Sequence, residues 1–354
     1  MYAAILAGGG GTRLRPLSTA DRPKPFLPLL GDETLFQRTV ARVRDLVDGD
    51  VAVVIDWRLA HLVRAQAPGV TLLEEPEGRN TAAAVALATV ALDRPEDEVM
   101  AILPADHVIG DETRFRAVLV AAGRDLAEGA FGVSDPLVTL GITPDRPATE
   151  YGWLVPDTAR GGTGRLAGRP LLRFEEKPAP ERAAALLATS GSAWNAGIFL
   201  WRRRAIRDAL AAFAPDVLEA VAEACAAGTL DAAYSTIRST SIDYAVMEPA
   251  AAAGRVLMGR LAAGWSDLGT WTALLAALGA PGTGAVVEAG EEVVAGPDDL
   301  VVVALGGRCH VRPGEGGSMT ADGPVAVLRD ARAGLPIVEA LLERCAAATE
   351  EAHP

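Results

Sequence analysis

The feature that most constrains this chain is the alternation of short apolar runs with stretches of helical periodicity through its first two thirds. The apolar runs predict buried strands at residues 2–7, 51–55, 70–74, 99–104 and 137–142. Helical periodicity occupies the intervals at residues 36–45, 81–92 and 113–127. This order is typical of a mostly parallel sheet flanked by helices, an α/β fold. Such a sheet binds ligands beyond the carboxyl ends of its strands.

A change of pattern divides the chain near residue 280. Strands at 171–175 and 197–201 and helices at 180–189 and 205–212 continue the first unit, which closes with a helix at 271–278. The Pro- and Gly-rich residues 280–284 are typical of a hinge. Short apolar runs follow between Gly-rich turns, and a helix is expected at 336–347. We therefore predict a large domain at residues 1–279 and a small β-rich C-terminal appendage at residues 280–354, ending in that helix.

Charge and cysteine usage exclude several classes of protein. The net charge is -13, and an acidic surface repels nucleic acid and anionic lipid, so neither is an expected partner. No run approaches the roughly 18 apolar residues that a membrane span needs, and the short apolar N-terminus lacks the basic lead of a signal peptide. Cys225, Cys309 and Cys345 are widely spaced and fit a reducing compartment. We predict a soluble cytoplasmic protein.

The first strand runs directly into four consecutive glycines, residues 8–11. Glycines let the backbone approach a ligand closely and direct several N–H groups at one anion. A dinucleotide turn is disfavoured because Pro16 restricts continuation into a helix, and a Walker loop because Gly-Lys-Ser/Thr is absent. Arg13, Arg15 and Lys24 follow closely in a chain of net charge -13. The cluster favours phosphate binding over the alternative, a solvated basic loop.

The glycine loop and seven later segments, in the same order, resemble the signature of the sugar-phosphate nucleotidylyltransferases. The first segment is residues 6–18 with 23–27, and the later ones are EGRNTA (77–82), LPADH (103–107), EYGW (150–153), FEEKP (174–178), WNAGIF (194–199), SIDYAVME (241–248) and WSDLGTW (265–271). The resemblance covers about residues 1–275. Within that family the segments are most similar to the mannose-1-phosphate guanylyltransferases.

The resemblance implies a fold and a reaction. The fold is a Rossmann-like sheet of the nucleotide-diphospho-sugar transferase type. The reaction is an in-line displacement, in which a sugar phosphate oxygen attacks the α-phosphorus of a nucleoside triphosphate and pyrophosphate leaves. GTP and α-D-mannose 1-phosphate are the implied substrates, GDP-mannose the product and Mg²⁺ the cofactor. The preference for guanine rests on residues 79–81, a segment that lies near the base in the family.

Roles carry over to the positions of this sequence that match the family's motifs. The implied nucleotide-binding residues are Gly8, Gly9, Gly11, Thr12, Arg13, Asn80, Thr81 and Asp106. The implied sugar-binding residues are Gly152, which leaves room for the sugar, Glu176, Lys177 and Asn195. Arg13, Lys24 and Lys177 are the implied catalytic residues, Lys24 acting at the α-phosphate and Lys177 on the sugar phosphate. Asp106 and Asp267 are the implied Mg²⁺ ligands.

The chemistry of these residues is consistent with the implied roles. Asp106 follows a buried strand and Asp267 lies in a short predicted turn, and Mg²⁺ prefers such carboxylates together with substrate phosphates. A turn cap or a surface carboxylate is the alternative for each. The attacking phosphate oxygen is already anionic and needs no base, so we expect His107 to be a hydrogen-bonded structural residue. We expect Asp243 and Glu248 to support the pocket.

Two departures from the family pattern keep other readings open. Arg15 stands where many bacterial relatives carry Trp, and the tail after residue 280 matches the family's β extension only loosely. The same chemistry with heptose or fucose 1-phosphate, or with another nucleotide, is the nearest alternative. A non-catalytic nucleotide-sugar sensor is disfavoured by the joint presence of Lys24, Asp106, Lys177 and Asp267. A dinucleotide-dependent oxidoreductase would leave Arg13 and Lys24 unexplained. We keep a homodimer as one option for the assembly.

Overall fold

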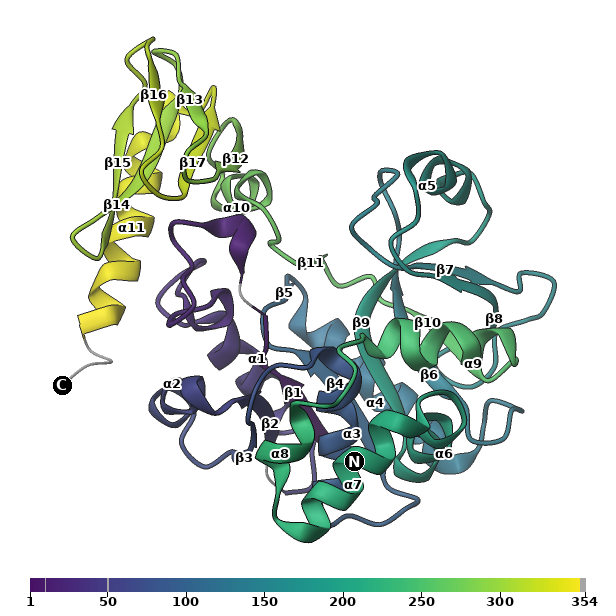
Figure 1. Cartoon of the computed structure of the whole chain (residues 1–354). Coiled ribbons are helices and arrows are strands. Elements are labelled where there is room, and N and C mark those ends of the chain that lie inside the picture. Colours follow the sequence, from purple (N-terminus) through teal and green to yellow (C-terminus); the bar gives the residue numbers. More distant parts are fainter. Residues whose placement is uncertain (10, 50, 351–354) are drawn as a thin grey trace.

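A nine-stranded sheet runs through the larger part of the computed structural model, which describes residues 1–9, 11–49 and 51–350 (Figure 1). The strand order is β3-β2-β1-β4-β9-β6-β10-β8-β7. These strands are β1 (Tyr2–Leu6), β2 (Ala52–Asp56), β3 (Thr71–Glu75), β4 (Val99–Pro104), β6 (Leu137–Ile142), β7 (Trp153–Pro156), β8 (Arg169–Glu175), β9 (Ala193–Arg202) and β10 (Val256–Arg260).

The direction of the strands changes at β9. β3, β2, β1 and β4 pair in parallel, as predicted, whereas β9 lies antiparallel between β4 and β6. β10 is parallel to β6 and antiparallel to β8. The first residues of β9 also pair with β7, and its last residues pair with β4. The sheet is therefore mixed, and its parallel half carries the glycine loop at its carboxyl edge.

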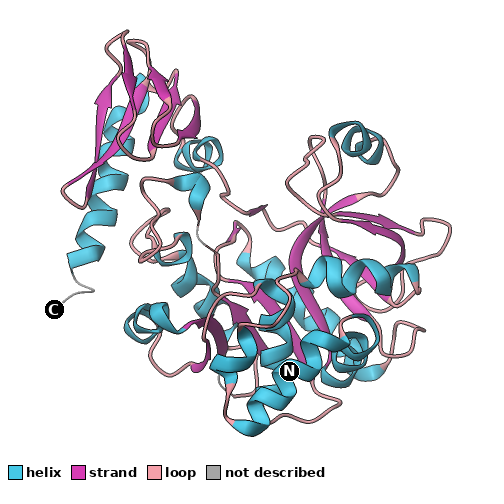
Figure 2. Ribbon diagram, in the orientation of Figure 1, coloured by secondary structure: helices cyan, strands magenta, loops and turns pink. Residues whose placement is uncertain are grey.

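Helices cover both faces of this sheet (Figure 2). They are α1 (Leu35–Arg44), α2 (Ala60–Gln66), α3 (Asn80–Ala91), α4 (Glu112–Glu128), α5 (Pro180–Leu187), α6 (Arg203–Phe213), α7 (Pro215–Ala227), α8 (Leu230–Tyr234), the π-helical turn η4 (Asp243–Met247), α9 (Glu248–Ala252) and α10 (Trp271–Leu278). Because successive strand residues point to opposite faces, Ala3 and Ile5 pack with α1, α2 and α4, whereas Tyr2 and Ala4 pack with α3, α6 and α7.

Local sequence explains where α1 begins and how α3 packs. Thr34 caps α1 through its side chain, which accepts from the Gln37 amide while the Gln37 side chain accepts from the Thr34 amide. α3 is apolar on nearly all sides and is buried between the sheet and α7, where its alanines allow close approach.

The C-terminal unit is a small antiparallel sheet covered by one long helix. Its strands are β12 (Thr283–Val287), β13 (Glu292–Val294), β14 (Leu300–Leu305), β15 (Arg308–Pro313), β16 (Ser318–Thr320) and β17 (Val325–Arg329), followed by η5 (Arg332–Gly334) and α11 (Leu335–Glu350). The order of the main sheet is β12-β17-β14-β15, and β13 pairs separately with β16. β16 is absent from the sequence prediction, because Ser318–Thr320 is too short to show periodicity.

The predicted hinge at residues 280–284 lies in a closely packed segment. Thr283 and Gly284 belong to β12, and a side chain on Gly284 would clash with Trp271 of α10. Gly282 has φ +96° and lies against the Arg329 carbonyl. These glycines allow close packing. The sequence alone does not distinguish glycines used in this way from the glycines of a flexible linker. Within the described residues no helix is long and apolar enough to cross a membrane, and Cys225, Cys309 and Cys345 form no disulfide.

Glu75, the last residue of β3, is a buried carboxyl group with 5% exposure. Burial is the main cause that raises the pKa of Glu75 to about 7. The nearby Tyr234 hydroxyl lowers this pKa in part, and the negative charge of Asp56 raises it further. Among the described residues, Oε1 of Glu75 has no hydrogen-bond partner. At pH values between its ordinary pKa and this raised pKa, Glu75 therefore keeps its proton in the folded protein and loses it in the unfolded chain.

Glu75→Gln should change how stability depends on pH. Native Glu75 favours folding below pH ~4.5, and this contribution is lost as the pH rises through about 7. The free energy of unfolding of the variant, relative to the native chain, should therefore rise by up to about 3 kcal/mol between pH 5 and pH 8. Urea unfolding at several pH values measures this difference. Glu74→Gln, at a 37% exposed position paired with Arg64, is the control and should lack the trend.

Candidate active site

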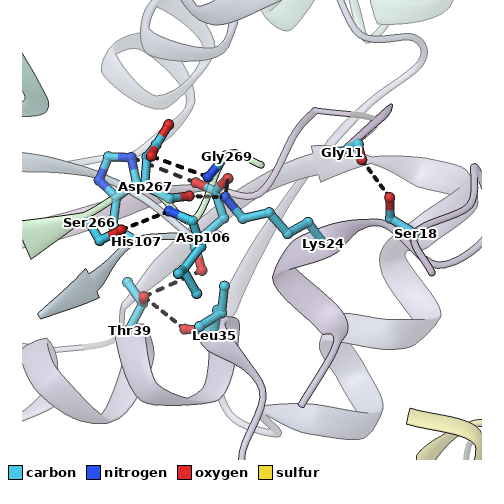
Figure 3. Close-up of polar contacts among 12 residues, drawn as sticks. Gly11, Ser18, Lys24, Leu35, Thr39, Asp106, His107, Ser266, Asp267 and Gly269 are labelled. Atoms are coloured by element: carbon cyan, nitrogen blue, oxygen red, sulfur yellow. Dashed lines mark hydrogen bonds and ion pairs between the residues drawn. The ribbon is translucent and has the colours of Figure 1, made fainter. Parts of the chain in front are cut away.

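Lys24 joins two aspartates that are far apart in the sequence (Figure 3). Its Nζ lies 2.6 Å from Oδ2 of Asp106 and also donates to the backbone carbonyl of Asp267. Lys24 begins the helical turn η2 (Lys24–Phe26), and Asp106 follows β4. Asp267 follows β11 (Trp265–Ser266), which pairs antiparallel with β5 (Val108–Ile109) just after Asp106. This short ladder brings both aspartates to the carboxyl edge of the parallel half-sheet.

The Lys24–Asp106 pair is largely removed from solvent on the lysine side, where the side chain is 6% exposed. Burial by itself would raise the pKa of Asp106, but the charge of Lys24, with a smaller effect of His107, outweighs it and lowers the pKa. The carboxylate therefore stays ionised at neutral pH. Removing either partner would leave a poorly solvated charge without its counter-ion.

The Asp267 carboxylate is fixed through one of its oxygens. Oδ1 accepts from the Tyr151 hydroxyl at 2.8 Å and from the Gly269 amide at 3.2 Å. The Tyr151 ring packs against Trp194 and Trp265, with ring centroids 5.1 Å and 5.6 Å away. Burial, and then the charge of Asp267, raise the pKa of Tyr151, so it remains a donor. Oδ2 makes no hydrogen bond in the described part of the chain and is available to a ligand.

His107 has a structural contact, as expected. The Trp265 indole donates to its Nδ1 at 3.1 Å, and its Nε2 lies 3.8 Å from Oδ1 of Asp106. Burial is the main cause that lowers the pKa of His107, although Asp106 opposes it. A neutral imidazole that accepts at Nδ1 holds β11 next to β5.

A pocket of ≈ 190 Å³ lies beside the aspartates. It is lined by Pro104, His107, Glu150, Tyr151, Gly152, Glu176, Lys177, Asn195, Ala196, Gly197, Asp243, Trp265 and Asp267. All four predicted sugar-binding residues are therefore together, with Asp267 at the same pocket. Glu176 is 7% exposed and its Oε1 lies 2.9 Å from Nζ of the half-exposed Lys177. The Glu248 carboxylate accepts from the Glu176 amide at 2.7 Å, which confirms Glu248 as a support.

The Asn195 amide is oriented by three contacts. Its Oδ1 accepts from the Thr139 hydroxyl at 2.8 Å and from the Gly197 amide at 3.2 Å, and its Nδ2 donates to Asp243 at 2.9 Å. One N–H therefore remains for a ligand. Burial, and then the charge of Glu176, raise the pKa of Asp243 to about 7. Asp243 thus supports Asn195, as the sequence indicated.

The absence of a side chain at Gly152 gives the Glu176 carboxylate its place. A methyl group built there would clash with the Glu176 carboxylate and would lie 3.3 Å from Asn195 and Phe174. The space made available by the glycine is thus occupied by Glu176 itself. Gly152 therefore positions Glu176, and it also lines the pocket that is predicted to hold the sugar.

The glycine loop is exposed at Gly8, Gly9 and Thr12, and Gly10 lies outside the described residues. Gly11 has φ +57°, and a Cβ there would lie 3.0 Å from Cβ of Lys24, so the turn requires glycine. The three cations of this region differ in their contacts. Arg13 is exposed and makes no hydrogen bond or ion pair within residues 1–9, 11–49 and 51–350. Lys24 is held by Asp106, whereas Arg15 turns away to Glu288, 3.5 Å distant.

Asn80 and Thr81 lie outside the pocket lining. Asn80 has φ +67° and its Oδ1 accepts from the Thr81 amide at 2.8 Å at the start of α3. The Thr81 hydroxyl accepts from the Ile242 amide at 2.8 Å, so it joins α3 to the segment before η4 and does not cap its own helix. Both residues follow β3, so they lie at the carboxyl edge of the parallel half-sheet.

Sequence reasoning missed the residues that surround the aspartates. Tyr151, Trp194 and Trp265 all occur inside the motif segments, and the Arg146 guanidinium lies 4.9 Å from the Trp194 ring centroid. The signal was therefore in the sequence. The contacts depend on the pairing of β7 with β9, where Trp153 is opposite Trp194, and spacing does not reveal such pairing.

Comparison with known proteins places this arrangement in context. Residues 2–280 match the family model of the nucleotidyl transferases. A mannose-1-phosphate guanylyltransferase of Sinorhizobium fredii is 43% identical over 287 residues, covering 77% of this chain and 54% of the relative. One from Escherichia coli K12 is 37% identical over 290 residues, covering 77% and 59%. This chain thus spans somewhat more than half the length of these two relatives. The crystal structure of mannose-1-phosphate geranyltransferase from Thermus thermophilus matches with a TM-score of 0.71 at 31% identity, covering 88% of this chain and 94% of that one.

Gly152→Ala should destabilise the protein because its methyl group must displace Glu176. Overpacking of this kind costs about 1–3 kcal/mol, measured as a loss in the free energy of unfolding by urea. Gly161→Ala is the matched control, since no atom lies within 4 Å of its added Cβ and its backbone suits alanine. Equal stabilities of the two variants would show that Gly152 has no packing role.

Proposed function

This chain belongs to the nucleotidyl transferase family, and on that basis we propose that it transfers a guanylyl group from GTP to α-D-mannose 1-phosphate. The products are GDP-mannose and pyrophosphate. The guanylyltransferases of Sinorhizobium fredii and Escherichia coli K12 support these substrates at 43% and 37% identity. The observation that carries the proposal is the Lys24 ammonium, held jointly by Asp106 and Asp267 beside the pocket of Glu176 and Asn195.

The donor atoms at this edge fit a magnesium ion. An Asp106 carboxylate oxygen and the Asp267 carbonyl already share one cation, the Lys24 ammonium, and Oδ2 of Asp267 is available. Mg²⁺ prefers such oxygens, often one or two carboxylates with substrate phosphates. No group of three or more His, Cys, Asp or Glu residues suited to a metal occurs in the described ranges, so phosphate and water would complete the coordination. When bound, the ion would neutralise charge on the triphosphate.

The protein has to overcome repulsion between two anionic substrates. The sugar phosphate oxygen forms the new bond to the α-phosphorus, and the bond from that phosphorus to the β-phosphate oxygen breaks as pyrophosphate leaves. The nucleophile needs no protein base. The exposed Arg13 and the N–H groups of the glycine loop hold the triphosphate. Lys24 uses two of its three N–H bonds on the aspartates and has one for a phosphate oxygen.

The pocket holds the sugar phosphate. Glu176 accepts from sugar hydroxyls, the remaining Asn195 N–H donates to one, and the half-exposed Lys177 contacts the phosphate. These groups are fixed by Glu248, Asp243 and Thr139, so little freedom is lost when the substrate binds. We further propose that the enzyme acts in the cytoplasm, and that it forms a homodimer, an assembly that analytical ultracentrifugation would detect.

Pyrophosphate release from a panel of triphosphates and sugar 1-phosphates tests the proposal directly. We expect release only with a divalent cation, and fastest with GTP and mannose 1-phosphate. Heptose and fucose 1-phosphates, with ATP, UTP and dTTP, form the rest of the panel. Faster turnover of another pair would reassign the substrate within the same chemistry, and no release from any pair would refute the proposal.

Asp267→Ala should lower the rate of pyrophosphate release about 10²-fold or more by removing a metal ligand. Tyr151→Phe removes the hydroxyl that donates to Asp267 Oδ1 and leaves the ring in place. It should raise the Mg²⁺ concentration for half-maximal rate by about 10-fold or more, because partners that orient a metal ligand contribute about 10–100-fold to metal affinity. Asp216→Ala, at a 53% exposed position on α7, is the control. A rate unchanged by Asp267→Ala would remove that residue from the site.

A further inference from the structure

One arginine of α11, in the C-terminal unit, donates to the backbone of the loop that carries Lys24. Arg344 donates from Nε to the Pro28 carbonyl at 2.8 Å and from Nη2 to the Leu29 carbonyl at 3.0 Å. Pro28 and Leu29 are buried and lie outside regular secondary structure. Buried carbonyl groups of this kind require donors, which no neighbouring strand supplies here. Arg344 therefore satisfies the backbone of the segment we call the Lys24 loop, residues 11–30.

A second contact fixes the beginning of the same loop. The Trp271 indole of α10 donates to the Arg15 carbonyl at 3.0 Å, and the Arg15 guanidinium lies 3.5 Å from Glu288, just after β12. β12 itself packs against the turn η1 (Thr12–Leu14). The C-terminal unit thus touches the loop on both sides of Lys24 in the sequence.

A shared apolar core joins these two contacts. The loop contributes Leu14, Leu17, Leu27 and Leu29 to one buried cluster. The same cluster contains residues of α10, β14, β17 and α11, among them Trp271, Leu274, Leu300, Val302, Leu328, Val338, Leu341 and Leu342. Figure 1 shows α11 and its sheet beside the purple loops that follow β1. One face of the loop is therefore built by the C-terminal unit, while Lys24 reaches the aspartates on the other.

We propose that the C-terminal unit is part of the active site's architecture, and that Arg344 is a positioning residue for Lys24 and Arg13. This inference rests on the proposed function, because the rate that Arg344 affects is that of the proposed reaction. The loop is held internally by local turns and has no ladder of strand hydrogen bonds, so it depends on its surroundings to keep its side chains in place. Displacement of a catalytic group by about 1 Å can cost up to about 10²-fold in rate.

Arg344→Ala, assayed well below its melting temperature, should lower kcat by about 10-fold to 100-fold. The KM for mannose 1-phosphate should stay within about 2-fold, because the groups that hold the sugar lie outside the loop and keep their own supports. Arg344→Lys retains a donor and should recover part of kcat. Arg312→Ala is the matched control, since Arg312 lies in the same unit and contacts Met319 and Glu315 instead of the loop.

Hydrogen exchange of the loop amides gives a readout that does not need activity. In Arg344→Ala the amides of residues 12–30 should exchange about 10-fold faster or more than in Arg312→Ala, because local opening of the loop becomes easier. If the native chain releases pyrophosphate, an Arg344→Ala kcat equal to that of the control overturns the inference, even if stability falls. If the native chain is inactive with every substrate pair, the proposed function fails, and exchange alone decides the role of Arg344.

Discussion

The Lys24 ammonium between Asp106 and the Asp267 carbonyl is the interaction on which the rest of the site depends. It joins a loop after β1, the end of β4 and the residue after β11, which are separated by as many as 243 positions in the chain. A largely buried charge is stable only with its partners, so each of these segments must be held accurately. The β5–β11 ladder, the Trp265–His107 bond and the C-terminal unit all serve that requirement. The fold around the site is therefore organised by one electrostatic contact.

Each polar group of the pocket is held by another polar group behind it. Tyr151 and Gly269 hold one oxygen of Asp267, and Asp243 and Thr139 fix the Asn195 amide. Glu248 holds the backbone of Glu176, while Gly152 gives the Glu176 side chain its place. These supports leave a small number of free donors and acceptors facing the pocket. Preorganised groups of this kind lose little freedom when a ligand binds.

Much of the fold could be predicted from the sequence, because short apolar runs and helical periodicity reflect burial directly. β4, β6 and α10 begin and end at the predicted residues. The proline and glycine signal at 280–284 is ambiguous, because these residues mark close packing, as Gly282 and Gly284 do here, as well as flexibility. The site residues were predicted from their motif segments, which do not indicate how the side chains are arranged. That Gly152 makes space for Glu176, or that Arg344 reaches Pro28, follows from strand pairing and tertiary packing, and neither has a local signal.

The antiparallel strand β9 has a consequence for how enzymes of this architecture can diverge. Its first residues border β7 and carry Asn195, whereas its last residues border β4, the strand that leads to Asp106. The pocket that contains Asn195 and the strand that leads to Asp106 therefore border one continuous strand. Under the proposed function, remodelling of the β7–β9 region to take a new sugar would also alter the strand beside the proposed nucleotide site. Exchange of modules between relatives is thus expected to transfer both halves together, and chimaeras divided within β9 should be poor enzymes even when both parents are active.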